Sequence, residues 1–153
     1  MNASLIEIDT KDIRLAAMDL LARREHSRLE LEQKLRKRFS DQLETIESEL
    51  DKLAAEGLQS DERLAEAFIR ARSSRGQGPS KIRMELKGKG LADEAISLAF
   101  EVAEVDWYEL VQAVAQKKFG EQLDNGPDLK LKAKVSRFLQ GRGFSYDHIS
   151  SLF

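Results

Sequence analysis

The chain has 153 residues and no cysteine, which excludes disulfide frameworks, thiolate-bound zinc and iron–sulfur clusters. Its two histidines are too few for a histidine-rich metal centre, and no apolar run approaches the roughly 18 residues of a membrane span. With 34% charged residues, 7% aromatic residues and a net charge of −2, the composition indicates a soluble, helix-rich, cytoplasmic protein. It argues against a generic nucleic-acid binder.

Helical periodicity extends over almost the whole chain, because apolar residues recur at three- and four-residue steps and no stretch shows sustained strand alternation. Residues typical of helix N-termini divide this helical pattern into separate helices. Ser27 and Glu30 have the spacing of a capping box, Pro79 suits a first helical position, and Asp106 and Ser145 suit N-caps. The predicted helices cover residues 10–23, 27–38, 41–56, 60–74, 79–89, 92–104, 106–119, 128–141 and 145–152.

Three glycines followed by an apolar residue mark helix ends. In this pattern the glycine takes the left-handed conformation just past the helix, and the next residue packs back against the last turn. The three pairs are Gly57-Leu58, Gly90-Leu91 and Gly143-Phe144.

The second, fifth and eighth predicted helices repeat one another. Each carries two apolar residues four positions apart: Leu31 and Leu35, Ile82 and Leu86, Val135 and Leu139. The equivalent leucines are 51 and 53 residues apart, and Phe39 stands where the first repeat would have its glycine. We predict an all-α fold of three tandem three-helix repeats, elongated and curved because each module contacts only its neighbours. Chance similarity between amphipathic helices is the alternative.

The repeat also predicts the limits of the modules. We expect an N-terminal extension at 1–9, followed by three-helix modules at 10–57, 58–105 and 106–153. Two arrangements are open for the extension, since Leu5, Ile6 and Ile8 either dock on the first module or stay loose.

Charge is sorted by helix. Residues 23–38, 70–89 and 130–142 carry net charges of +4, +6 and +5, whereas residues 39–66 and 91–109 carry −7 and −6. Modules stacked in similar orientation would form a positive stripe that could follow a phosphate backbone or an acidic protein surface. Alternatively, neighbouring helices neutralise one another and face solvent. The residues that we expect to bind a partner are Arg70, Arg72, Arg75, Lys81, Arg83, Lys87, Lys89, Lys130, Lys132, Lys134, Arg137 and Arg142.

The motifs of enzyme chemistry are missing. Paired glycines at 76–78, 88–90 and 141–143 lack the third glycine and the preceding strand of a dinucleotide-binding loop. His26 lacks a second histidine at metal-binding spacing, so we expect a solvated or capping role for it, and a surface role for His148. We therefore predict no catalytic residue, no metal site and no cofactor.

The aromatic residues mostly have core-like spacing. A base-stacking platform needs exposed aromatic residues among basic ones, and only the region of Phe138 and Phe144 comes close. Because Phe138 continues the apolar stripe of Leu131 and Val135, core packing is favoured.

Three segments carry a family resemblance: LLARREHS at 20–27, LAAEGL at 53–58 and KVSRFLQGRGF at 134–144. In this order and spacing they resemble the RecX family, regulators of the RecA recombinase, from about Asp12 to Phe153. His26 departs from the aromatic residue that the family often has there. The matching motif residues are Arg24, Glu25, Ser27, Leu31, Leu35, Asp61, Gly78, Ile82, Leu86, Gly90, Phe138, Leu139, Gly143 and Phe144.

The resemblance implies three three-helix repeats and a non-enzymatic inhibitor that binds the groove of the RecA filament on single-stranded DNA. Such a protein restrains ATP hydrolysis, strand exchange and coprotease activity, and with them homologous recombination, DNA repair and the SOS response. We expect a monomer with weak direct DNA contact at most and no membrane association. The alternatives are a helical protein that coats single-stranded DNA and a helical scaffold for another protein partner.

Overall fold

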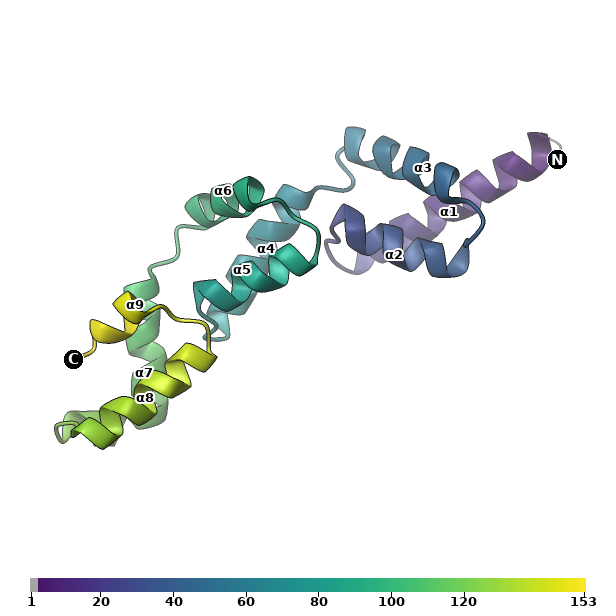
Figure 1. Cartoon of the computed structure of the whole chain (residues 1–153). Coiled ribbons are helices and arrows are strands. Elements are labelled where there is room, and N and C mark those ends of the chain that lie inside the picture. Colours follow the sequence, from purple (N-terminus) through teal and green to yellow (C-terminus); the bar gives the residue numbers. More distant parts are fainter. Residues whose placement is uncertain (1–2) are drawn as a thin grey trace.

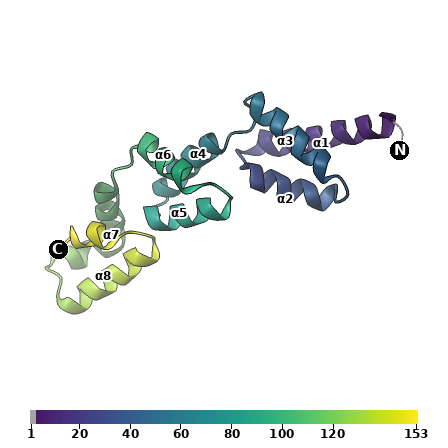
Figure 2. The same cartoon turned by 45° about the horizontal axis from the view of Figure 1, so that its top comes forward.

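The computed structural model describes residues 3–153, with side chains from residue 10 onward, and this part of the chain contains nine α-helices and no strand (Figure 1). The helices form three groups of three along an elongated, curved body (Figures 1 and 2). They are α1 (Ala3–Arg23), α2 (Arg28–Arg38), α3 (Leu43–Ala55), α4 (Asp61–Ser74), α5 (Pro79–Gly88), α6 (Asp93–Ala103), α7 (Trp107–Asp124), α8 (Leu129–Gly141) and α9 (Tyr146–Ser150).

Each group of three helices encloses its own cluster of buried apolar side chains. The repeated apolar pairs of α2, α5 and α8 lie at the centres of these clusters, and all six side chains are at most 1% exposed. Trp107 packs against the clusters of both the second and the third group. The predicted all-α repeat is therefore confirmed, while the exact module limits stay a prediction.

The capping signals position most helix ends as expected. Ser27 and Glu30 form the predicted capping box, Pro79 begins α5, and the side chains of Asp106 and Ser145 cap α7 and α9. Gly57, Gly90 and Gly143 have φ values of +76°, +88° and +98°. Leu91 and Phe144 pack inside as expected, whereas Leu58 is 42% exposed and belongs to none of the three buried clusters.

Two helices are longer than expected. Helix α1 begins at Ala3 instead of near residue 10. The two alternatives for Leu5, Ile6 and Ile8, docked or loose, concern side chains outside the described ones. Helix α7 continues through Gly120 to Asp124, because Leu123, one turn beyond Phe119, still packs against the third core.

The middle helices α2, α5 and α8 meet end to end, and at both junctions the N-cap residue of one helix donates to the C-cap carbonyl of the next. The hydroxyl of Ser27, the N-cap of α2, donates to the carbonyl of Lys89 at the end of α5 over 2.7 Å. The N–H of Gly78, the N-cap of α5, donates to the carbonyl of Arg142 at the end of α8, also over 2.7 Å. The N–H of Ser80 adds a bond of 3.0 Å to the carbonyl of Gly143.

Glycine at the end of a middle helix serves this docking as well as the turn. A Cβ on Gly90 would lie 2.8 Å from Leu29 of α2, and one on Gly143 would lie 2.5 Å from the Cβ of Lys81. No described residue docks in this way on the turn after α2. Phe39 at that turn therefore meets no such contact, which explains why the first repeat departs from the glycine pattern.

Candidate partner-binding surface

The acidic and basic helices occupy opposite edges of the body. In Figures 1 and 2, α3 and α6 lie along one edge, and α2, α5 and α8 lie along the other. Helix α6 carries Asp93, Glu94 and Glu101, and α8 carries Lys130, Lys132, Lys134 and Arg137 with no acid. The sorting of charge seen along the sequence thus becomes a sorting of charge in space.

Half of the predicted partner-binding residues have exposed side chains without an intramolecular partner in the described structure: Arg70, Arg75, Lys81, Lys130, Lys134 and Arg137. The other half contact neighbouring side chains or backbone. Arg72 pairs with Glu85 at 3.7 Å, Lys87 with Asp93 at 3.0 Å and Lys89 with Glu30 at 3.0 Å. Neutralisation between helices therefore accounts for part of the basic set but not for all of it.

The remaining basic residues of the set lie over aromatic rings. Arg83 lies over Phe100 and donates to the hydroxyl of Ser97 over 3.2 Å. Lys132 lies over Phe153, and Arg142 lies over Phe138 with its guanidinium carbon 5.2 Å from the ring centre. Such contacts hold the charges near the surface without neutralising them.

His26 is not solvated, because it is only 1% exposed at the junction of the first two groups. The capping alternative fits better, because the ring of His26 contacts the carbonyl of Arg24, the residue that follows α1. Its Nδ1 lies 3.0 Å from the carbonyl of Arg24, and its Nε2 lies 3.0 Å from Nζ of Lys34. A carbonyl accepts and an ammonium donates, so the ring is neutral with its proton on Nδ1. Burial lowers the pKa of His26, and the positive charges of Arg24 and Lys34 lower it further.

His148 is also more enclosed than its predicted surface role implies. Its ring is half-buried, packs edge-on against Tyr108 at 4.8 Å and completes a capping box with Ser145. Burial lowers its pKa. It supports the last helix.

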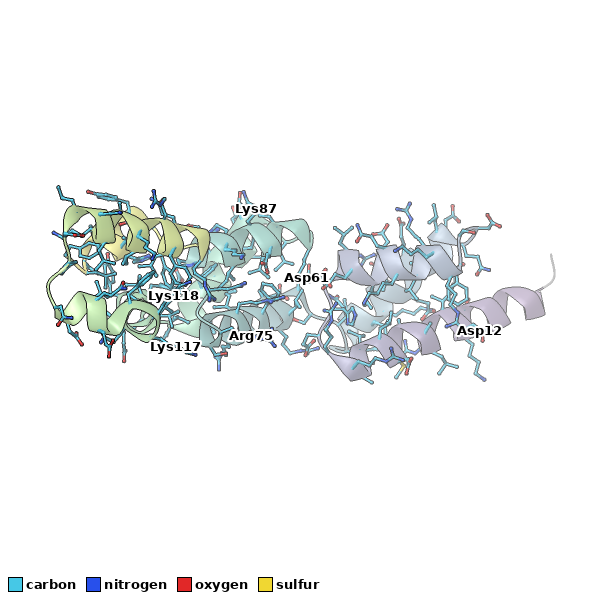
Figure 3. The ribbon with its side chains drawn as sticks, turned by 90° about the horizontal axis from the view of Figure 1, so that it is seen from below. Asp12, Asp61, Arg75, Lys87, Lys117 and Lys118 are labelled. Carbon is cyan, nitrogen blue, oxygen red and sulfur yellow. The ribbon has the colours of Figure 1, made fainter. Side chains whose placement is uncertain are left out.

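A cleft of about 490 Å³ lies where the second and third groups meet. Its apolar lining comes from Leu110, Val114 and Phe138, and its basic lining comes from Arg75, Lys117, Lys118 and Arg142. Figure 3 shows Arg75, Lys117 and Lys118 close together at this boundary. Sequence reasoning missed the two lysines, since they form an isolated pair between the two basic segments and only the fold brings them beside Arg75.

Phe138 combines the two roles that the sequence left in competition. Its ring packs against the third core and edge-on to Phe119 at 5.6 Å, as core packing requires. The ring also lines the cleft, with Nζ of Lys118 4.0 Å from its centre.

Within residues 3–153 no helix has the length and apolar character of a membrane span. The described histidine, aspartate and glutamate side chains form no group that could hold a metal ion. The features of the described surface that could bind a partner are the exposed cations and the cleft with its apolar lining.

Comparison with known families decides what kind of protein presents this surface. A model of the second three-helix domain of RecX matches residues 60–99, and a model of the third three-helix domain of RecX matches residues 104–153. The chain belongs to the RecX family. The regulatory protein RecX of Pseudomonas putida strain GB-1 is 52% identical over 141 residues, covering 92% of this chain and 88% of its own. That of Ectopseudomonas mendocina strain ymp is 46% identical, covering 92% and 91%.

Solved structures agree with the three-module architecture. The crystal structure of RecX from Lactobacillus salivarius superposes with a TM-score of 0.80 at 25% identity, covering 95% of each chain. A second crystal structure, of a regulatory protein RecX, has a TM-score of 0.72 at 25% identity and covers 99% of this chain and 77% of that chain.

Most RecX motif residues build the junctions and cores of the fold. Leu31, Leu35, Ile82, Leu86, Leu139 and Phe144 are buried in the cores, and Ser27, Gly78, Gly90 and Gly143 form the end-to-end contacts of the middle helices. Asp61 accepts from the N–H of Arg28 over 2.9 Å, Glu25 accepts from Arg63 over 3.0 Å, and Arg24 donates to Glu30 over 2.7 Å. The motif residues thus stabilise the fold, and most of the exposed basic residues are not part of the motif.

Proposed function

We propose that this RecX chain is a non-enzymatic inhibitor of the RecA recombinase that binds the groove of the RecA filament on single-stranded DNA. It acts in the cytoplasm as a monomer and lowers ATP hydrolysis, strand exchange and coprotease activity. The observation that carries the proposal is membership of the RecX regulatory family, at 52% identity over 92% of the chain.

The shape and charge of the chain support this mechanism. An elongated body with separate modules can contact several subunits of a helical filament at once. A ligand that fits one filament geometry better than another shifts the filament toward that geometry, and this lowers the activities that need the other one. The exposed, unpartnered cations of the predicted partner-binding set suit an acidic protein surface or nearby phosphates.

Two other functions compete with this proposal. A protein that coats single-stranded DNA would use the same cations, but a net charge of −2 gives it little electrostatic affinity for bare DNA. A helical scaffold for a different partner would leave recombinase activity unchanged.

The deciding experiment measures ATP hydrolysis by RecA on single-stranded DNA while this protein is titrated at two salt concentrations. Binding to the bare DNA is measured in parallel by fluorescence anisotropy. We expect inhibition well below the concentration that binds bare DNA. A coating mechanism predicts instead that inhibition tracks DNA occupancy, and that affinity falls by about 0.7 decades per contacted phosphate for each decade of salt.

Inhibition that follows DNA occupancy at both salt concentrations would contradict filament-directed binding. The absence of any inhibition would leave a RecX fold that serves another partner.

A further inference from the structure

The cleft between the second and third groups of helices has the composition of a binding site for an anionic ligand. Its volume of about 490 Å³ lies within the range of about 300–1,000 Å³ of ligand pockets. Four cations line it: Arg75, Lys117, Lys118 and Arg142. Among the described residues that line it there is no carboxylate, so these charges face one another without neutralisation.

The internal repeat provides a comparison for this lack of acid. Lys89 and Arg142 occupy equivalent positions at the ends of α5 and α8. Lys89 is neutralised by Glu30, the third residue of α2, at 3.0 Å. The third residue of α5 is Lys81, so the corresponding position near Arg142 carries a positive charge. One junction therefore contains its own counter-charge, and the other leaves its positive charges available to an anion from outside.

The apolar lining narrows the class of anion. A stacked base would need a free aromatic face, but the ring of Phe138 already has Lys118 4.0 Å and Arg142 5.2 Å from its centre. Leu110 and Val114 offer aliphatic surface instead. Carboxylates beside an apolar side chain would satisfy both parts of the lining.

We propose that this cleft binds a short acidic peptide segment of a protein partner, with carboxylates on its four cations and an apolar side chain against Leu110 and Val114. This inference rests on the proposed function only in the identity of the partner protein, which would be RecA. Binding itself can be measured on the isolated protein, so the two proposals can fail separately.

The test is a fluorescence anisotropy titration with a labelled octapeptide of alternating glutamate and leucine. Ala113 is exposed and lines the cleft, so Ala113→Glu places a carboxylate beside the cations without disturbing a core. We expect Ala113→Glu and the double variant Arg75→Glu/Lys117→Glu to weaken binding by about tenfold or more. The matched control is Lys11→Glu/Lys37→Glu, which makes the same charge change at exposed positions of the first group and should stay within about twofold.

Equal affinity of the wild-type protein and Ala113→Glu would overturn the proposal, as would the absence of binding by the wild-type protein. If the wild-type protein bound a glutamine–leucine octapeptide as tightly as the glutamate–leucine octapeptide, the carboxylates would not contribute to binding, and the proposal of an acidic ligand would be wrong. Displacement of the peptide by an eight-nucleotide oligothymidylate at a lower concentration than by unlabelled peptide would assign the cleft to single-stranded DNA. Recombinase inhibition is measured separately, so a failed peptide titration with intact inhibition overturns the cleft alone.

Discussion

At the scale of single residues, the junction between the first two groups depends on the ionised form of Glu30. Burial opposes its ionisation, but hydrogen bonds from Arg24, from the N–H of Ser27 and from Lys89 outweigh burial and lower its pKa to about 2. Its side chain is only 13% exposed, so solvent screens these contacts little. Glu30 thus ties its own helix start to the end of α5.

We expect Glu30→Gln to lower the free energy of unfolding by about 1–3 kcal/mol near neutral pH. The neutral amide cannot form the ionic contacts that the carboxylate makes with Arg24 and Lys89. A depressed pKa gives stability that is present above the unfolded value of about 4.5 and is lost as pH falls toward about 2. The difference between wild type and variant should therefore shrink by about half or more between about pH 7 and pH 3.

Urea denaturation at both pH values measures this difference, with Glu32→Gln on the same helix as the control. An equal loss at both pH values would show that Glu30 acts through neutral hydrogen bonds instead of through its charge.

At the scale of the elements, the meeting of α5 and α8 depends on close backbone approach. A Cβ on Gly143 would lie 2.5 Å from the Cβ of Lys81 and 2.8 Å from its backbone N, and one on Gly78 would lie 2.4 Å from the carbonyl carbon of Gly143. Gly143 also has a φ of +98°, where a side chain is strained. Both the turn and the contact therefore need glycine.

We expect Gly143→Ala to destabilise the protein by about 2–4 kcal/mol, through strain at positive φ and through forced separation of α5 from α8. Gly141→Ala is the control, because this glycine ends the same helix with no atom within 4 Å of its added Cβ. It should be neutral or stabilising by up to about 1 kcal/mol. Thermal and urea denaturation followed by circular dichroism measure both, and similar midpoints for the two variants would contradict the docking role.

At the scale of the whole molecule, the twelve predicted partner-binding residues separate into cations that the fold uses and cations that it leaves free. Arg72, Lys87 and Lys89 form ion pairs within the chain. Arg70 and Lys81 are exposed and lack a partner in the described structure. Only the second kind can be reversed in charge without loss of an internal contact.

We expect Arg70→Glu/Lys81→Glu to raise the concentration needed for half-maximal inhibition of RecA ATP hydrolysis by about tenfold, with an unfolding midpoint no lower than that of the wild-type protein. The control Lys11→Glu, at an exposed position of α1 outside the basic helices α2, α5 and α8, should inhibit like the wild-type protein. Full inhibition by the folded Arg70→Glu/Lys81→Glu variant would remove these two positions from the binding surface.

The fold could be predicted from the sequence because it repeats local signals. The apolar pairs such as Leu31 and Leu35, and the glycine turns at Gly90 and Gly143, act within a few residues and recur in order. Contacts between modules could not be predicted in this way. The burial of His26 depends on elements from two groups, since Gln59 of the neighbouring loop donates to its carbonyl.

The candidate site shows the same division between local and long-range information. Arg75 and Arg142 were expected to bind a partner from the local excess of positive charge, and both line the cleft. Lys117 and Lys118 were not, because their helix is nearly neutral and their importance arises only from the approach of α7 to the end of α4. A count of charge along the chain cannot detect a site assembled from three helices.

The end-to-end order of the middle helices has a consequence for their dipoles. The C-terminal carbonyls of α8 meet the N-terminal amides of α5, so opposite partial charges meet at that junction. Accordingly, α8 has no basic residue in its last turn and α5 has no acidic residue in its first. The outer ends differ, since α2 finishes with Arg36, Lys37 and Arg38, and Asp128 caps the start of α8. At the α8–α5 junction the neighbouring helix therefore compensates the dipole, and at the outer ends side chains do so. The α5–α2 junction combines both, because Lys87 lies in the last turn of α5 and Glu30 in the first turn of α2.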